Sequence, residues 1–434
     1  MRRPTPQHRS SSSTERNGAA ARASAMPGPE RVGWGFIGLY TLAYTGTSLL
    51  FLAPLLVSLA LKVNDLAGID AAPSRLALVT SVGSLLAMLA NPFFGRLSDR
   101  TSSPWGMRKP WMLVGLTAGS LGILTVALAP NVAVVLIGWC IAQVFFNALL
   151  AAMAAVMPDQ IPTDQRGVVS GIIAICLPVA SVLGTFLVQL FDQNVLSMLL
   201  VPCAVGALLV LTFVAGFTDR RLEPGHKQPW SIRELLATFY VNPRRNPDFA
   251  WAFASRFLLV TAYAFLVTYQ AYYLIEHLGT NEDAVPHQIY LGTLTQSAAL
   301  VVTALVTGKL SDRTGRRKAF VCAAALMYAV ALFVIAGAHD TPAYLVGMAL
   351  GGIGFGVYMA VDLALVVDVL PDTDHAAKDL GVLNIAGALP FSLAPAIAPA
   401  ILAIGGDSYR VLFGVAGACA VVGAASILPV KGVR

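Results

Sequence analysis

Long apolar runs separated by short polar clusters dominate the chain. No Asp, Glu, Lys or Arg occurs within residues 34–61, 110–158 or 168–191. An α-helix of about 20 apolar residues crosses the hydrocarbon of a bilayer. Lipid offers no partner to unpaired backbone groups, so apolar runs of this length can only be membrane-spanning helices. The pattern therefore predicts an all-α integral membrane protein, with the lipid bilayer as its surroundings.

Turn residues and charge clusters divide the apolar sequence into twelve predicted transmembrane spans. Their expected bounds are 34–61, 75–94, 110–129, 132–157, 168–190, 195–217, 249–275, 287–307, 318–338, 343–369, 381–404 and 409–430. A polar segment at 218–248 separates the sixth span from the seventh. We therefore expect a six-helix bundle at 34–217 and a second one at 249–430.

The segments outside these bundles are polar. Residues 1–33 are rich in Ser, Ala and Arg and have no apolar core, which favours a disordered cytoplasmic tail over a cleaved signal peptide. Within the 218–248 linker, PWSIRELLATFY has a Ser and a Glu at the spacing of a capping box. This predicts a short amphipathic helix on the membrane surface. Residues 431–434 form a short cytoplasmic C-terminus.

Charge settles the expected orientation. Only 12% of the residues are charged, whereas soluble domains carry about a quarter. If the N-terminus is cytoplasmic, only Lys62, Arg75 and Arg410 of the 29 basic residues lie in outside loops. Because basic residues concentrate on the cytoplasmic side, we expect a multi-pass protein of the cell membrane with both termini inside. The net charge of +6 follows from this topology, so no nucleic-acid partner is expected.

One charged phrase occurs twice. Residues 95–111 read GRLSDRTSSPWGMRKPW, and residues 308–318 read GKLSDRTGRRK. The landmarks that recur at an offset of 213 are Gly95 with Gly308, Asp99 with Asp312, and Pro158 with Pro371. Equivalent residues at one constant offset predict two pseudo-symmetric six-helix halves. Parallel repeats of this kind hold a substrate site near the bilayer midplane in known transporters.

The repeated phrase resembles the signature of the major facilitator superfamily. The twelve spans, the two six-helix repeats and PDQIPTDQRG at 158–167 extend this resemblance over the chain after residue 33. The first copy has four extra residues, Ser102 to Trp105, and in this longer form is similar to the glycoside–pentoside–hexuronide and sucrose-transporter branch. The resemblance implies alternating access, with spans 1, 4, 7 and 10 lining the cavity.

The resemblance also implies a gating role for the repeated motif, which in the family holds the two halves together when the protein opens outward. The residues concerned are Gly95, Asp99, Arg100 and Arg108 in the first copy and Gly308, Asp312, Arg313 and Arg316 in the second. A glycine lets helices approach closely, and a carboxylate suits a helix N-terminus. A short inside loop collects Arg and Lys without any function, but that does not explain a Gly and an Asp repeated at fixed spacing.

Two ionisable residues lie well inside predicted spans, where charge is costly and usually functional. Arg256 is in span 7 and Asp362 is in span 10. They lie at similar distances from the cytoplasmic ends, and because the resemblance implies that spans 7 and 10 both line the cavity, they could meet as a pair. In one hypothesis Asp362 binds the coupling proton and Arg256 tunes it or contacts substrate. In the other, the pair only fixes helix packing.

Polar residues at helical spacing mark candidate cavity faces. They are Tyr40 and Tyr44 in span 1, Gln143 and Asn147 in span 4, Ser181, Thr185 and Gln189 in span 5, Tyr263 and Gln270 in span 7, and Tyr358 in span 10. Amides, hydroxyls and aromatic faces suit a neutral polyhydroxylated ligand. Such residues also join membrane helices by hydrogen bonds, so the pattern indicates a cavity only as a set.

These features predict a secondary active transporter, a proton-coupled symporter of a sugar or glycoside. Sodium-coupled members of the sugar branch carry acidic residues on helices 2 and 4, and spans 2 and 4 here have none. The alternatives are a drug or metabolite exporter of the same superfamily and a non-transporting membrane sensor. No constellation typical of an enzyme, a metal site or a disulfide framework is evident, and we expect a monomer with no cofactor besides the coupling ion.

Overall fold

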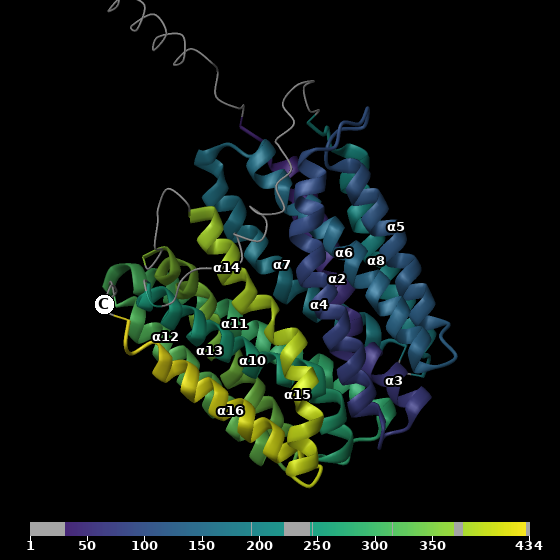
Figure 1. The fold of residues 1–434 in the computed structure, drawn as a ribbon, viewed down its shortest axis with the longest axis vertical. Helices are drawn as coiled ribbons and strands as arrows, with labels where there is room; N and C mark the ends of the chain where they lie inside the picture. Colours follow the sequence, from purple (N-terminus) through teal and green to yellow (C-terminus); the bar gives the residue numbers. More distant parts are fainter. Residues whose placement is uncertain are drawn as a thin grey trace, which may run out of the picture.

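The computed structural model describes residues 31–191, 193–220, 244, 246–314, 316–368 and 376–430. Within these residues all regular structure is helical, and twelve helical spans are long and apolar enough to cross a membrane (Figure 1). The prediction of an all-α protein with twelve transmembrane helices is therefore confirmed. The predicted amphipathic helix of the linker lies outside the described residues, as does the tail before Arg31.

The chain forms two successive groups of six spans. The first group contains α2 (Trp34–Ala53), η1 (Pro54–Ser58) and α3 (Leu59–Ala67) as one span, then α4 (Ala72–Asp99), α5 (Lys109–Ala127), α6 (Val132–Gln160), α7 (Thr163–Gln189) and α8 (Val195–Gly216). The second contains α10 (Pro247–Glu276), the short η2 (Glu282–Ala284), α11 (Val285–Thr314), α12 (Arg317–Gly337), α13 (Thr341–Asp368), α14 (Ala376–Ala388), α15 (Pro390–Ile404) and α16 (Tyr409–Ser426). We call them the N-half and the C-half.

The first span is longer than predicted and is not uniform. The predicted end at residue 61 was set by Lys62, but the helix continues to Ala67, with the Lys62 and Asn64 side chains buried. At Pro54 the helix widens into the π-helical turn η1, because proline has no backbone N–H to donate and its ring crowds the preceding turn.

Prolines in other spans differ in their effect on the helix. The eleventh span breaks at Leu389, so that α14 ends at Ala388 and α15 begins at Pro390. Pro178, in contrast, lies inside an uninterrupted α7. A proline inside a span therefore does not by itself interrupt the helix.

The last residues of the predicted tail contact the N-half. The Val32 N–H donates to Gln165 Oε1 at 2.9 Å, and Gln165 Nε2 donates back to the Val32 carbonyl at 3.2 Å. The Arg31 guanidinium pairs with Asp164 at 3.0 Å. Residues 31–33 are thus held at the start of α7, where Asp164 also complements the positive end of the helix dipole.

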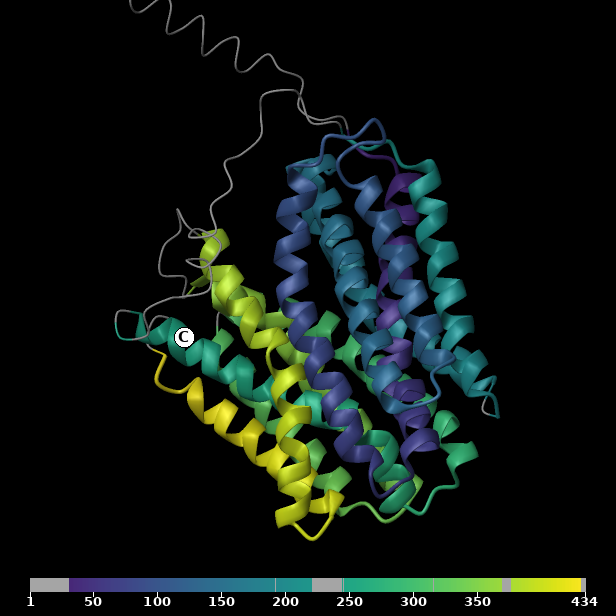
Figure 2. The ribbon, with the colours of Figure 1, turned by 45° about the vertical axis from the view of Figure 1, so that its right-hand side comes forward.

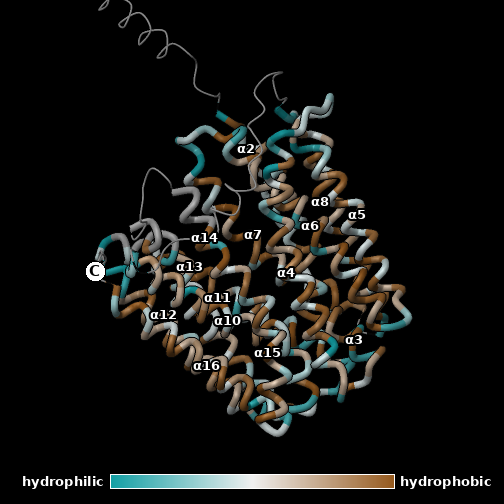
Figure 3. The backbone as a smooth tube through the Cα atoms, viewed as in Figure 1, coloured by the Kyte–Doolittle hydropathy of each residue, from teal (hydrophilic) through white to brown (hydrophobic). Residues whose placement is uncertain are grey.

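The two halves meet along a few helices. α4 packs against α15, α7 packs against α11, and α10 contacts the η1 and α3 end of the first span. In Figure 2 the ribbons of the two halves converge at one end and diverge toward the other. Hydrophobic residues occupy the length of the helices, and hydrophilic residues gather at the loops (Figure 3), as expected for a bundle surrounded by lipid.

Candidate functional site

The two ends of the bundle differ in charge and in the contacts between the N-half and the C-half. The end with the loops 100–108 and 161–162 carries the repeated motif, and we call it the basic end. The opposite end, with the loops 68–71, 277–281 and 405–408, is called the closed end, because the hydrogen bonds between the halves lie toward it.

These inter-half hydrogen bonds involve several helices. Among the described residues, the pairs are Gln270 Nε2 to the Leu56 carbonyl (3.3 Å), Tyr272 Oη to the Ala60 carbonyl (3.0 Å), Tyr269 Oη to the Pro73 carbonyl (3.5 Å), Ser392 Oγ to the Ser81 carbonyl (2.8 Å), Asn64 Nδ2 to Glu282 Oε1 (3.0 Å) and His287 Nδ1 to Gln189 Oε1 (2.8 Å). The inter-half hydrogen bonds identified among the described residues therefore seal the closed end.

A cavity lies between the halves on the basic side of this seal. Its volume is about 40 Å³, and it is lined by Leu56, Leu177, Pro178 and Ser181 from the N-half and by Tyr263, Leu266, Val267, Gln270, Thr293, Gln296, Ser297, Leu300 and Phe355 from the C-half. None of these described residues is charged. Tyr263 stacks on Phe355 with ring centroids 4.7 Å apart, and the Gln296 Nε2 group is buried with no hydrogen-bond partner in the structure.

Some of the residues predicted to line a substrate cavity do line this one. Tyr263 and Gln270 line the cavity from α10, as does Ser181 from α7. Gln189 and Thr185 are farther along α7: Gln189 contacts His287 at the seal, and Thr185 is fully buried.

The predicted cavity residues of span 1 and span 4 lie elsewhere. Tyr40 is fully buried inside the N-half, where its hydroxyl donates to the Met153 carbonyl and its ring contacts Phe213 of α8, so it does not line this cavity in the present conformation. Tyr44 packs edge-on against Tyr40. An aromatic ring with a polar tip fits a helix interface as well as a cavity, and the sequence alone does not tell the two apart.

Gln143 and Asn147 lie between α4 and α6. The Asn91 amide donates to Asn147 Oδ1 at 3.4 Å, and Asn147 Nδ2 donates to the Gln143 carbonyl at 2.8 Å. Neither lines the cavity between the halves. These amides join two membrane helices, a common role for polar side chains there.

Sequence reasoning missed the contribution of the eighth span. Thr293, Gln296, Ser297 and Leu300 of α11 all face the cavity. Their spacing of three, four and seven residues is that of one helical face. This polar stripe was present in the sequence and would have identified α11 as a cavity helix.

The two ionisable residues inside the spans form a direct pair. Arg256 Nη1 on α10 lies 2.7 Å from Asp362 Oδ2 on α13. The Arg256 Nε atom is buried and has no hydrogen-bond partner in the structure. Tyr358, one turn before Asp362, is buried and contacts the Phe355 ring of the cavity. The pair lies within the C-half. It is next to Tyr358 and is not among the residues that line the cavity.

The first copy of the repeated motif is an ion-pair network within the N-half. Arg108 is 2.6 Å from Asp99 and 2.8 Å from Asp159, and it donates to Ser98 at 2.6 Å. Asp219 Oδ2 accepts the backbone N–H groups of Arg108 and Lys109 at 2.6 and 2.8 Å. One arginine thus ties the ends of α4, α5 and α6 together.

The motif glycines make no close inter-helix contact in this conformation. A Cβ added to Gly95 would meet only Ala151, at 3.9 Å, and one added to Gly308 would meet nothing within 4 Å. Arg100, Arg313 and Arg316 lie at the basic end, with Arg313 and Arg316 exposed. The Asp312 side chain lies outside the described residues. The gating role of the motif therefore stays a prediction.

In the described part of the chain, no group of three or more His, Cys, Asp or Glu is placed to hold a metal ion.

Comparison with known proteins identifies relatives. A model of the MFS/sugar transport protein family matches residues 37–405. A protein described as an uncharacterized symporter of Synechocystis sp. is 44% identical over 54 residues, which are 12% of this chain and 10% of that protein. The multidrug resistance protein MdtL of Klebsiella pneumoniae is 31% identical over 111 residues, which are 26% of this chain and 27% of that one. The chain thus matches about a quarter or less of the length of these curated relatives.

Solved structures share the fold at low sequence identity. The nucleoside transporter NupG superposes with a TM-score of 0.74 at 13% identity, covering 91% of this chain and 99% of that one. The peptide transporter POT in complex with sulfate gives a TM-score of 0.71 at 15% identity, covering 92% and 95%. A bacterial homologue of the lysosomal transporter Spinster, in an inward-facing conformation, gives 0.65 at 13% identity, covering 91% and 98%.

Proposed function

The chain belongs to the MFS/sugar transport protein family, and we propose that it is a proton-coupled symporter of a sugar or glycoside. It is a multi-pass membrane transporter of the MFS type and not an enzyme. The substrate, the coupling ion, the direction of transport and a monomeric functional unit belong to the proposal.

The cavity between the halves carries the proposal for the substrate. It offers a stacked pair of rings, Tyr263 on Phe355, together with the amides of Gln270 and Gln296. Aromatic faces pack against the apolar face of a sugar ring, and amides and hydroxyls satisfy its hydroxyl groups without fixed charge. The unpartnered Gln296 Nε2 is a buried donor that a substrate hydroxyl would satisfy.

The position of the seal supports an alternating-access cycle. The distribution of basic residues assigns the basic end to the cytoplasm, and the halves are joined at the opposite end. In this assignment the structure is inward-facing. The cavity of about 40 Å³ holds little more than a water molecule. A sugar is expected to enter as the seal opens and the halves rock.

The Arg256–Asp362 pair supports proton coupling. A carboxylate 2.7 Å from a guanidinium inside a span changes its partner when it takes up a proton, and ionisable groups at such depth usually serve a transported ion. Protonation of Asp362 would release Arg256, and the released charge would alter contacts between α10 and α13.

The experiment is uptake into proteoliposomes, with a panel of radiolabelled sugars and glycosides under imposed proton or sodium gradients. We expect accumulation of at least one sugar when the outside is acidic, and collapse of that accumulation when a protonophore is added. Accumulation driven by sodium and indifferent to pH would refute the proton coupling. The matched segment of MdtL favours one rival, an exporter; efflux of drugs with no sugar uptake would establish it.

A further inference from the structure

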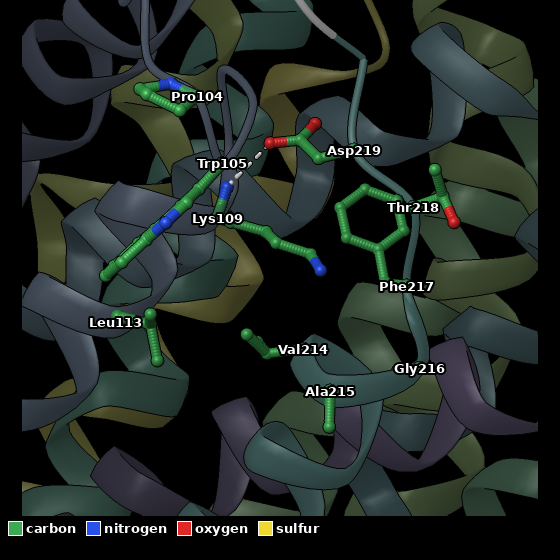
Figure 4. Close-up of a pocket in the computed structure, with 10 residues that line it drawn as sticks. All are labelled: Pro104, Trp105, Lys109, Leu113, Val214, Ala215, Gly216, Phe217, Thr218 and Asp219. Atoms are coloured by element: carbon green, nitrogen blue, oxygen red, sulfur yellow. Dashed lines mark hydrogen bonds between the residues drawn. The ribbon is translucent and has the colours of Figure 1, made fainter.

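The four residues inserted in the first copy of the repeated motif form part of a pocket on the outer side of the N-half. Ser102 to Trp105 have no counterpart in the second copy, GKLSDRTGRRK. Two of them, Pro104 and Trp105, line a pocket of about 700 Å³ at the basic end. The other lining residues are Lys109, Leu113, Val214, Ala215, Gly216, Phe217, Thr218 and Asp219 (Figure 4). This pocket is separate from the cavity between the halves.

The pocket lies where the polar loops meet the lipid-facing surface. Its walls are the start of α5 and the end of α8. Farther along these helices, Val114 and Leu211 are each 44% exposed and Leu208 is 62% exposed, an outer face that only lipid can cover in a membrane protein. Trp105 is 67% exposed beside them, and tryptophan is enriched at the level of lipid headgroups.

The polar groups of the pocket favour an anionic ligand. The Asp219 carboxylate is satisfied by the backbone N–H groups of Arg108 and Lys109, at the positive end of α5. The Lys109 ammonium lies 5.8 Å from the centre of the Phe217 ring, and no ion pair with a carboxylate is found for it among the described residues. Figure 4 shows the Lys109 side chain extending into the space bounded by Trp105, Leu113 and Phe217. One lysine ammonium without a carboxylate partner among the described residues therefore points into a pocket with apolar lower walls.

We propose that this pocket binds the headgroup of an anionic phospholipid from the leaflet at the basic end. Lys109 pairs with the phosphate, Trp105 covers the glycerol region, and Leu113 with Val214 contacts the first part of an acyl chain. The volume of about 700 Å³ is that of a small-molecule site. A ligand with one charged end and one apolar end matches this arrangement, and the membrane supplies it at high local concentration. The repeat insertion thereby gives the N-half a lipid contact for which the C-half motif lacks a counterpart of Pro104 and Trp105.

The test is native mass spectrometry of the intact, purified protein in detergent, titrated with phosphatidylglycerol and, separately, with phosphatidylcholine. Lys109→Gln is expected to weaken the tightest phosphatidylglycerol adduct about five-fold, the effect of one lysine near an anionic surface. Lys109→Arg should retain the adduct, and Trp105→Ser should weaken it. The matched control is Arg75→Gln, which removes one exposed basic residue at the closed end.

Three results would overturn the proposal. One is an equal loss of phosphatidylglycerol adducts in Lys109→Gln and Arg75→Gln. A second is equal binding of phosphatidylcholine, which would show an apolar contact without recognition of charge. The third is displacement of the lipid by millimolar inorganic phosphate, which would identify a site for a soluble anion. Monodisperse elution of each variant in size-exclusion chromatography confirms that the comparison is made on folded protein.

Discussion

Arg256 and Asp362 lie 106 residues apart in sequence, yet their side chains meet at 2.7 Å inside the C-half. The contact joins α10 to α13, and a Cβ added to Gly387 of α14 would lie 3.5 Å from Arg256 Nη2. Three spans of the C-half therefore surround one ion pair. Any change in the charge of Asp362 acts on all three.

Asp362→Asn is expected to abolish proton-driven accumulation of substrate while leaving substrate exchange at equal pH on both sides. The amide takes up no coupling proton, and the variant stays in one charge state through the cycle. It also leaves Arg256 without its carboxylate, which we expect to cost about 3 kcal/mol of stability. Uptake and counterflow in proteoliposomes measure the first effect, and thermal unfolding measures the second.

The double variant Arg256→Gln with Asp362→Asn separates the two roles of the pair. It removes both charges together, so most of the lost stability should return. If the pair only fixes helix packing, proton-driven accumulation returns as well. If Asp362 carries the proton, accumulation stays absent in a protein of restored stability.

Tyr263→Ala is expected to raise the KM for substrate about five-fold, because it removes a stacking face worth about 1 kcal/mol. Tyr263 and Phe355 are 4.7 Å apart with ring planes 20° from parallel, so Tyr263→Phe keeps the platform and should change the KM little. Initial uptake rates at varied substrate concentration provide the measurement. A large effect of Tyr263→Phe would instead indicate that the hydroxyl is the substrate contact.

The sequence predicted the membrane architecture well, because long uncharged runs admit one structural solution. It also indicated that Arg256 and Asp362 could meet, since they lie at similar depths in spans 7 and 10, which the family resemblance places at one cavity. The position of Tyr40 inside the N-half does not follow from the sequence, because a tyrosine on a helix satisfies its hydroxyl equally well against a backbone carbonyl such as that of Met153. Which face of a helix turns inward depends on its neighbours.

The same reason explains the missed stripe on α11. Thr293, Gln296 and Ser297 follow helical spacing, whereas the family resemblance implies a cavity lined by spans 1, 4, 7 and 10. The seal between α7 and α11 brings the eighth span against the cavity. The polar stripe marks one face of α11 in the sequence, but that this face meets α7 at the cavity is a tertiary relationship.

Arg108→Ala is expected to lower stability by about 3 kcal/mol, since it leaves the largely buried Asp159 carboxylate without its partner. Arg108 is 2.8 Å from Asp159 and 2.6 Å from Ser98. Arg313→Ala, at an exposed position of the second motif copy, is the matched control and should change stability by less than about 0.5 kcal/mol. Thermal unfolding in detergent measures both. Equal losses of stability in the two variants would show that the ion pairs of Arg108 do not hold the helix ends together.

His277, just past the end of α10, is expected to make the protein less stable in acid. Burial lowers the pKa of His277, and although the Ala338 carbonyl opposes that shift, the nearby charge of Arg410 and the ring of His339 reinforce it. A lowered pKa stabilises the folded protein fully above the ordinary value of 6.5, and this contribution is lost as pH falls through the folded-state value. His277→Gln should flatten the fall in melting temperature between pH 7 and pH 5, whereas a profile parallel to that of the wild type would contradict this assignment.

Gln189→Ala is expected to loosen the seal at the closed end. Gln189 Oε1 and His287 Nδ1 are 2.8 Å apart and join α7 to α11, so the substitution removes one hydrogen bond between the halves. A net loss of about 1 kcal/mol shifts the balance toward the conformation opened at that end about five-fold. The readout is the labelling rate of Ser181→Cys, a cavity position, with a membrane-impermeant thiol reagent added from the closed side, in a background with the native cysteines replaced. The matched control is Gln288→Ala, which removes a bond to Thr280 within the C-half and should leave the labelling rate unchanged. If both variants label Ser181→Cys at the same rate, the Gln189–His287 contact does not hold the seal.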